Sequence, residues 1–178
     1  THTALVGQPG CGASTLLRLI AGTLRPTSGD AILGQRRVNA LKPARRPVLL
    51  AGPEPGVPLR WSVEHALVAA VRSRSMDRED RHREMTLAAA RWRLDALLSR
   101  KIRTLSSTEA TLVEIARIDL LRPAVLLADR LLERAGAAVR GSLADELYRA
   151  LRVHGTTVIS APASRDELAF TDRIAVLD

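Results

Sequence analysis

Residues 3–22 read TALVGQPGCGASTLLRLIAG, and this stretch decides the fold. The apolar run from Thr3 to Val6 predicts a strand, and the apolar residues from Ser14 to Ala21 recur at helical spacing until Gly22, a typical helix stop. A glycine-rich loop lies between the two. The stretch therefore predicts a strand, a tight turn and a helix in direct succession.

This loop has the frame of a phosphate-binding (Walker A) loop with one substitution. Glycines let successive backbone N–H groups face phosphates at a helix N-terminus, and the hydroxyl of the first Ser or Thr reaches Mg²⁺. Ser14 can supply that hydroxyl, but Ala13 replaces the lysine that would reach the β- and γ-phosphates. A purely structural turn is the alternative. The residues predicted to contact nucleotide are Gly7, Gly10, Cys11, Gly12, Ala13, Ser14 and Thr15.

The rest of the chain alternates short apolar runs with longer segments of helical periodicity. This alternation is typical of parallel strands joined by crossover helices, and it predicts an α/β fold. Residues 52–58 contain three prolines and two glycines, which indicate a loop or hinge. The further strands are expected at 31–33, 48–51, 124–128, 156–160 and 174–177, and the further helices over 63–71, 87–98, 109–121 and 139–151.

Length and composition favour one domain without a membrane span. The chain has 178 residues, 46% of them hydrophobic, which suffices for one substantial core. No apolar run approaches the roughly 18 residues of a transmembrane helix, and the chain opens on Thr1 without a signal-peptide pattern. The single cysteine, Cys11, has no partner for a disulfide or metal cluster, which favours a reducing compartment.

The net charge of +8 raises the alternative of nucleic-acid binding, because clustered basic residues attract polyphosphate. The arginines, however, are scattered among alanine and leucine, which indicates a generically basic, solvated surface. Only four aromatic residues are available for base stacking, namely Trp61, Trp92, Tyr148 and Phe170. No nucleic-acid partner is therefore expected.

Beyond the loop, several stretches resemble the nucleotide-binding domain of ATP-binding-cassette (ABC) transporters, in the family's order and across nearly the whole chain. The helix from Ser14 to Gly22 is followed by Arg25-Pro26-Thr27-Ser28-Gly29, a turn typical of this family. The other stretches are Leu105-Ser106-Ser107-Thr108-Glu109, which resembles the LSGGQ signature, Ile115-Ala116-Arg117, Arg122 to Asp129 before and within Walker B, Gly155 to Ile159, and Thr171 to Asp178.

The resemblance implies an α/β P-loop fold of ABC type, with a mainly parallel sheet flanked by helices and an inserted helical subdomain. It divides the single domain 1–178 into a core of 1–52 and 124–178 and a helical subdomain of about 53–123. The chain begins at the P-loop strand, so the family's upstream adenine-stacking strands are expected to be missing from it.

The resemblance also assigns metal-site and catalytic positions. Asp129 matches the Walker B aspartate that holds Mg²⁺ through water, with Ser14 as the other metal-site residue; a cap or loop role for Asp129 is the alternative. The next position, where the family has a glutamate that polarises the attacking water, is Arg130, which cannot accept a proton. No catalytic residue is therefore assigned.

Further family contacts to the γ-phosphate and the partner domain are also replaced. Counting from neighbouring motifs places Pro53 at the Q-loop glutamine and Ala163 at the switch histidine. The signature keeps Ser106 but has Ser107 and Thr108 in place of two glycines, which adds side chains where backbone approaches the partner's nucleotide. The segment Glu133-Arg134-Ala135-Gly136 differs from the family's Ser-Ala-Leu-Asp.

Three functional hypotheses follow. The first is a degenerate cassette that binds ATP or ADP with Mg²⁺ weakly or statically and acts as a scaffold or regulatory subunit of a membrane transporter. The second is an active ATP-hydrolysing subunit with non-consensus residues, and the third is a nucleic-acid-associated ABC protein. The resemblance implies a transmembrane transporter subunit as partner, a homo- or heterodimer with another ABC domain, and a cytoplasmic location at the inner face of the cell membrane.

Arg130 carries a sharper hypothesis. Because its position lies near the γ-phosphate in the family, its guanidinium could replace the positive charge missing at Ala13 and hold nucleotide without cleaving it. The alternative is that Arg130 points to solvent or pairs with Asp129 or Glu133.

Overall fold

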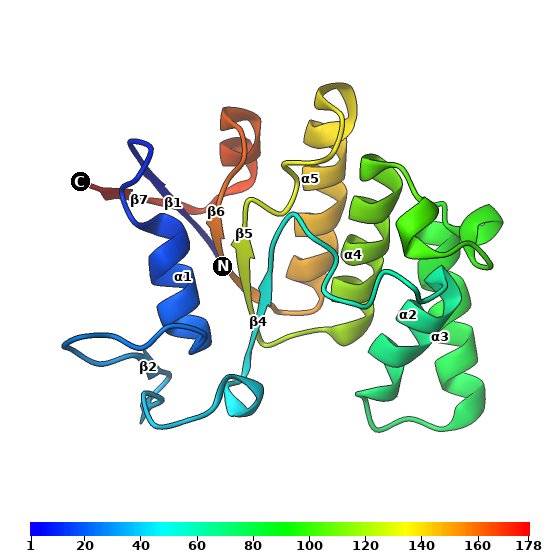
Figure 1. Cartoon of the computed structure of the whole chain (residues 1–178), viewed down its shortest axis with the longest axis horizontal. Coiled ribbons are helices and arrows are strands. Elements are labelled where there is room, and N and C mark those ends of the chain that lie inside the picture. Colours follow the sequence, from blue (N-terminus) through cyan, green and yellow to red (C-terminus); the bar gives the residue numbers. More distant parts are fainter.

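A computed structural model describes all residues 1–178 and contains a five-stranded, entirely parallel sheet. The strand order is β4-β5-β6-β1-β7, so the first strand lies between two strands from the end of the chain (Figure 1). The predicted α/β fold is confirmed. The strands are β1 (His2–Gly7), β4 (Val48–Ala51), β5 (Val125–Asp129), β6 (Thr157–Ala161) and β7 (Arg173–Leu177).

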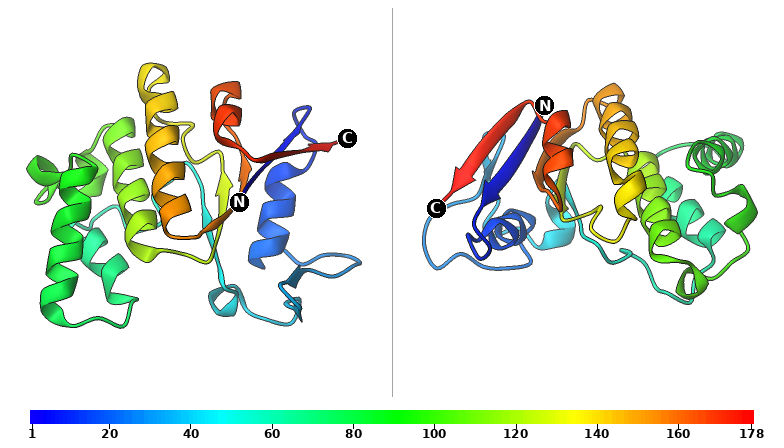
Figure 2. Two further views of the ribbon diagram at one scale, coloured as in Figure 1. Left: turned by 180° about the vertical axis from the view of Figure 1, so that it is seen from behind. Right: turned by 90° about the horizontal axis from the view of Figure 1, so that it is seen from above.

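Helices cover both faces of this sheet (Figure 2). Helix α1 (Ala13–Ala21) packs on one face, where buried Leu17 meets Leu5 and Leu127. Helices α4 (Ser107–Leu121) and α5 (Ala137–Val153) lie on the other face, where Leu126 joins the larger core. The continuous apolar run in β5 therefore supplies both cores, because successive side chains of a strand point to opposite faces.

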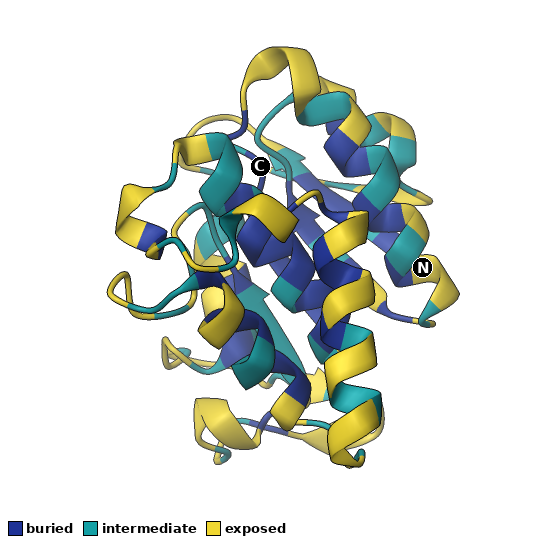
Figure 3. Ribbon diagram, turned by 90° about the vertical axis from the view of Figure 1, so that its right-hand side faces the viewer, coloured by how far each residue is buried: buried dark blue, intermediate teal, exposed yellow.

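Helices α2 (Val63–Arg72) and α3 (Arg78–Arg91) pack with α4 beyond the edge strand β4, as Figure 1 shows at the right. Their inward faces belong to the larger core, and the outer faces of these helices are exposed (Figure 3). The separation of 53–123 as a subdomain stays a prediction. None of the helices combines the length and the apolar character needed to cross a lipid bilayer.

The expected helix over 87–98 is wrong in its bounds. The side chain of Asp77 accepts a hydrogen bond from the Asp80 N–H at 2.7 Å and caps a helix that begins at Arg78, within the arginine-rich segment. The helix ends at Arg91 because Arg93 adopts a left-handed conformation with φ 55°. Leu94 is still fully buried, but from the turn that follows, so apolar spacing there marks packing without helix.

Smaller elements complete the chain. The hairpin of β2 (Ile32–Leu33) and β3 (Arg36–Arg37) lies outside the main sheet, and β3 was not predicted because two arginines carry no strand signal. The short 3₁₀ helices are η1 (Pro43–Arg45), η2 (Asp95–Leu97), η3 (Ile102–Thr104) and η4 (Arg165–Phe170).

A buried carboxylate joins three helices. Asp119, on α4, accepts hydrogen bonds from the Arg91 guanidinium at 3.0 Å, the Trp92 Nε1–H at 3.0 Å and the His154 Nε2 at 2.8 Å. Arg91 and Trp92 come from the end of α3, and His154 caps α5. The contact therefore connects α3 with α4 and α5, the two helices on one face of the sheet.

His2 makes folding stability depend on pH. Its buried ring lies 2.8 Å from the Ser160 hydroxyl and packs on Tyr148, and burial lowers the His2 pKa below 6.5. The unfolded chain therefore binds a proton at His2 more readily than the folded chain does. With respect to His2, the free energy of unfolding is highest above pH 6.5 and falls as the pH drops below 6.5. We expect a loss of at most about 1.4 kcal/mol per pH unit in urea titrations.

The control for this dependence is His2→Gln, which should flatten the slope just below pH 6.5. The buried carboxyl of Glu167 acts in the opposite direction, because burial raises its pKa and its stabilising contribution fades as pH rises above 4.5. An unchanged slope in His2→Gln would contradict the assignment to His2.

Candidate functional site

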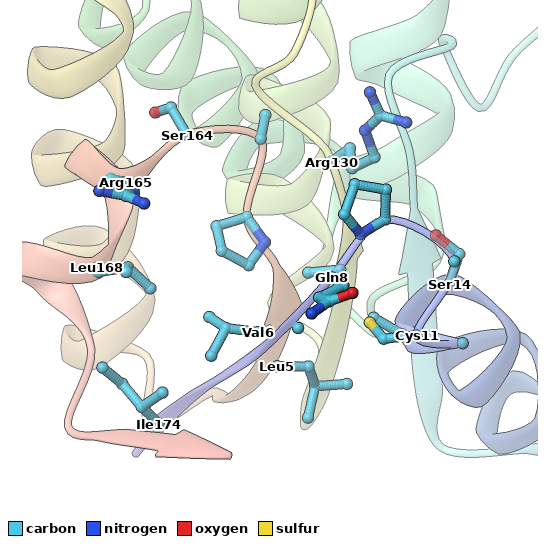
Figure 4. A pocket seen from close by; sticks show the side chains of 18 of the residues that line it. Leu5, Val6, Gln8, Cys11, Ser14, Arg130, Ser164, Arg165, Leu168 and Ile174 are labelled. Carbon is cyan, nitrogen blue, oxygen red and sulfur yellow. The ribbon is translucent and has the colours of Figure 1, made fainter. Parts of the chain in front are cut away.

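The loops after β1, β5 and β6 meet at the carboxyl edge of the sheet around a cavity of about 800 Å³ (Figure 4). This is the edge at which open parallel sheets bind ligands. Residues 7–15 form one wall, Arg130 follows β5, and residues 161–165 run from the end of β6 into the loop after it. The cavity therefore brings together segments separated by more than a hundred residues.

The loop conformation explains its glycines. A Cβ atom on Gly7 would lie 2.4 Å from the Leu177 carbonyl oxygen and 2.7 Å from the Cys11 Sγ, so no larger residue fits. Gly10 and Gly12 have φ of 92° and 88°, in the left-handed region that side chains disfavour. These glycines turn the chain from β1 directly into α1.

The N-terminus of α1 is open to an anion. Gly12 provides no side-chain cap, and the first turn contains no acidic residue. The N–H groups of residues 12–15 have no acceptor within the chain. Free N–H groups at a helix N-terminus bind phosphate, with support from the helix dipole. Ala13 and Thr15 line the same cavity but add no charge.

Ser14 and Asp129 meet, as the metal-site prediction requires. The Ser14 hydroxyl donates to the Asp129 Oδ1 at 2.6 Å, from the first turn of α1 to the end of β5. Asp129 is 7% exposed, and its other oxygen lies 3.8 Å from the Arg18 guanidinium. Mg²⁺ takes few protein ligands and keeps several waters, so two adjacent oxygens beside open N–H groups fit Mg²⁺ with a phosphate ligand. Their binding role stays a prediction.

Arg130 lines the cavity immediately after Asp129. Its backbone adopts φ 53°, and its N–H donates to the Ala161 carbonyl at 2.9 Å. Its guanidinium pairs with Glu133, one of the partners expected from sequence, in an exposed contact. A guanidinium donates hydrogen bonds only, so this position provides no base for an attacking water.

Ala163 and Pro53 occupy different surroundings. Ala163 lines the cavity after β6, and its N–H donates to the Glu167 carboxylate at 3.0 Å, but its methyl group offers no phosphate contact. Pro53 lies in the loop between β4 and α2 and does not line the cavity. The same loop is tied to α4, because the Gly56 N–H donates to the Glu114 carboxylate at 3.0 Å.

The signature-like residues lie outside this cavity. Ser106 caps α4 in a reciprocal capping box with Glu109, whose pKa is lowered by hydrogen bonds from the Ser106 backbone and hydroxyl. Ser107 begins the helix, and the Thr108 hydroxyl accepts from the Gly136 N–H at 3.2 Å. Within one chain, these residues therefore do not join the residues around Ser14.

Sequence reasoning missed Gln8, Arg165 and Leu168, which also line the cavity. The available signal was topological, because β6 lies directly beside β1 and the loops after neighbouring parallel strands share one edge. Arg165 has no ion pair within the chain.

Solved structures of ABC proteins share this fold. An ATP-binding cassette solved as a dimer in a post-hydrolysis state with ADP and Pi matches 99% of this chain and 81% of its own, with a TM-score of 0.81 and 21% identity. A putative ABC transporter ATP-binding protein from Pyrococcus furiosus matches 99% of this chain and 84% of its own, with a TM-score of 0.80 and 21% identity. The fold is thus the α/β P-loop fold of ABC proteins.

Sequence comparison gives the family. Residues 1–132 match the family model described as ABC transporter. The sn-glycerol-3-phosphate import ATP-binding proteins of Rhizobium meliloti (strain 1021) and Brucella abortus (strain 2308) are each 33% identical over 175 residues, which is 98% of this chain. The chain spans about half the length of these relatives. Together with the fold, the family match shows that this chain belongs to the ABC transporter family, as an ATP-binding domain.

Proposed function

We propose that this domain binds Mg²⁺-nucleotide and hydrolyses ATP slowly, as a subunit of an import-type ABC transporter. One observation carries the proposal: the 2.6 Å contact between Ser14 and Asp129 is retained beside open N–H groups, while a guanidinium occupies the next position. The groups that hold phosphate and metal are present. Position 130 lacks a group that would accept a proton from water, and position 13 lacks a cation that would neutralise the γ-phosphate.

The chemistry of each group supports this division. The N–H groups at the start of α1 would hold phosphate oxygens, and Ser14 and Asp129 would hold Mg²⁺, which draws charge from the phosphates when bound. Losing a positioned base typically costs about 10²- to 10⁴-fold in rate. Because Arg130 cannot act as this base and no lysine supports the phosphates, turnover is slow and the domain acts by holding nucleotide.

The relatives support the transport setting. Those reported above are named for import of sn-glycerol-3-phosphate, and the similar cassette was solved as a dimer. We infer a transmembrane transporter subunit as partner and pairing with another ABC domain, which places the protein at the inner face of the membrane. The loop that holds Pro53, with α2 to α4, is the proposed docking region, and no nucleic-acid role is proposed.

A second candidate is an ATPase that hydrolyses ATP fast enough to energise import. The 33% identity across almost the whole chain to import ATP-binding proteins favours it. In that case, groups other than a side chain at position 130 would orient the attacking water. The two candidates differ in turnover and share the metal site.

The experiment compares the protein with Asp129→Asn and a matched control. We expect Mg²⁺-ATP binding in calorimetry with turnover only slightly above background, and an affinity about 10- to 150-fold weaker in Asp129→Asn, because a charge-assisted contact is lost. Asp145→Asn, which alters an exposed carboxylate on α5, should leave the affinity unchanged. Turnover well above background that disappears in Asp129→Asn would favour the second candidate.

A further inference from the structure

The cavity is built for an anion. No aspartate or glutamate lines it, and its two cationic side chains are Arg130 and Arg165. The open N–H groups of residues 12–15 add partial positive charge at its loop wall. The lining residues themselves therefore carry positive charge, while two nearby carboxylates, Asp129 and Glu133, lie outside the lining in contact with Ser14 and Arg130.

We propose that Arg130 is the phosphate-binding cation of this site, and that Glu133 competes with phosphate for it. The inference rests on the proposed nucleotide binding and assigns a residue to it. A guanidinium forms paired hydrogen bonds with phosphate oxygens, so one arginine can hold the charge that a lysine at position 13 would hold.

The position of Arg130 favours it over Arg165. Arg130 directly follows Asp129, and its backbone is fixed by the bond from its N–H to Ala161. In Figure 4 Arg130 lies on the side of the cavity where the loop leads to Ser14, whereas Arg165 lies on the opposite wall. Arg130 and the start of α1 line the same cavity, so phosphate held by the N–H groups of α1 would share that cavity with the Arg130 side chain.

The present partner of Arg130 is weakly held. The side chains of Arg130 and Glu133 are 55% and 38% exposed, and exposed ion pairs contribute little to stability because water screens them. A phosphate group carries more negative charge than one carboxylate, and the neighbouring N–H groups hold it in place. The guanidinium can therefore exchange Glu133 for phosphate, and Glu133 lowers the affinity for nucleotide.

A double-mutant cycle tests this exchange. Calorimetry on the whole protein would measure the binding of Mg²⁺-ATP and of inorganic pyrophosphate to the wild type, Arg130→Ala, Glu133→Gln and the double variant. We expect Arg130→Ala to weaken both ligands about tenfold or more. Glu133→Gln should tighten both severalfold, and this gain should vanish when Arg130 is absent.

Two controls separate this role from general charge. Arg60→Ala removes an exposed arginine outside the cavity and should change neither affinity, and Arg165→Ala should have a smaller effect than Arg130→Ala. The inference about Arg130 is overturned if the wild type and Arg130→Ala bind with equal affinity, or if Glu133→Gln still tightens binding without Arg130. Either result leaves the proposed nucleotide binding intact. A wild type that binds neither ligand would overturn the proposed nucleotide binding as well.

Discussion

Replacing Ala13 by lysine together with Arg130 by glutamate should raise the steady-state rate of ATP hydrolysis by about 10²-fold or more. The lysine supplies a positive charge from the first residue of α1, and the glutamate supplies a carboxylate after Asp129, where a water could be deprotonated. Both positions line the same cavity, so both new side chains have space beside them. The measurement is phosphate release at saturating Mg²⁺-ATP.

The single variants and a metal-site variant are the controls. Arg130→Glu alone should bind nucleotide poorly, because it introduces a carboxylate without the compensating lysine. Ala13→Lys alone should improve binding with little gain in rate. Asp129→Asn added to the double variant should abolish the gained activity. An unchanged rate in a double variant that still binds nucleotide would show that positions 13 and 130 do not limit turnover.

Sequence was sufficient to predict the elements that carry strong local signals. The strand at 48–51 has the predicted bounds, and the helices near 14–21 and 109–121 begin within a residue or two of prediction. These segments combine continuous or periodic apolar residues with glycine or proline at their ends. Helix α3 was missed over residues 78–86 because arginine and glutamate, which suit a solvent-exposed helix, conceal the apolar period.

The sequence predicted the local motifs of the site but not all the contacts between segments that are distant in the chain. The glycine-rich loop was found from its own sequence beside an apolar strand, whereas Asp129 was assigned by the resemblance to ABC proteins, and the structure brings Ser14 and Asp129 into contact. The wall formed by Arg165 depends on strand order, because β6 lies directly beside β1. Such tertiary relations leave no local pattern. The hypothesis about Arg130 came from the sequence, with Glu133 among its possible partners, and the structure adds that Arg130 lines the cavity and pairs with Glu133.

Asp119→Ala should lower the free energy of unfolding by about 3 kcal/mol, because removing one partner of a buried ion pair leaves the others uncompensated. Asp119 is 5% exposed, and its loss would leave the Trp92 Nε1–H, in a fully buried ring, without an acceptor. His154 would lose its contact to α4 at the same time. The half-exposed Arg91 can turn to water, which limits its share of the loss.

Urea or guanidinium unfolding measures this effect, with Asp145→Ala as the matched control. Asp145 also pairs with an arginine, Arg149, but on the exposed face of α5, so its removal should cost less than about 1 kcal/mol. If Asp119→Ala unfolds at the same denaturant concentration as Asp145→Ala, the buried contact does not hold the helices together. If it unfolds much earlier, the buried carboxylate of Asp119 holds α3 to α4 and α5 more strongly than the more exposed ion pairs Glu84–Arg122 and Arg93–Glu146 do, because water screens exposed pairs.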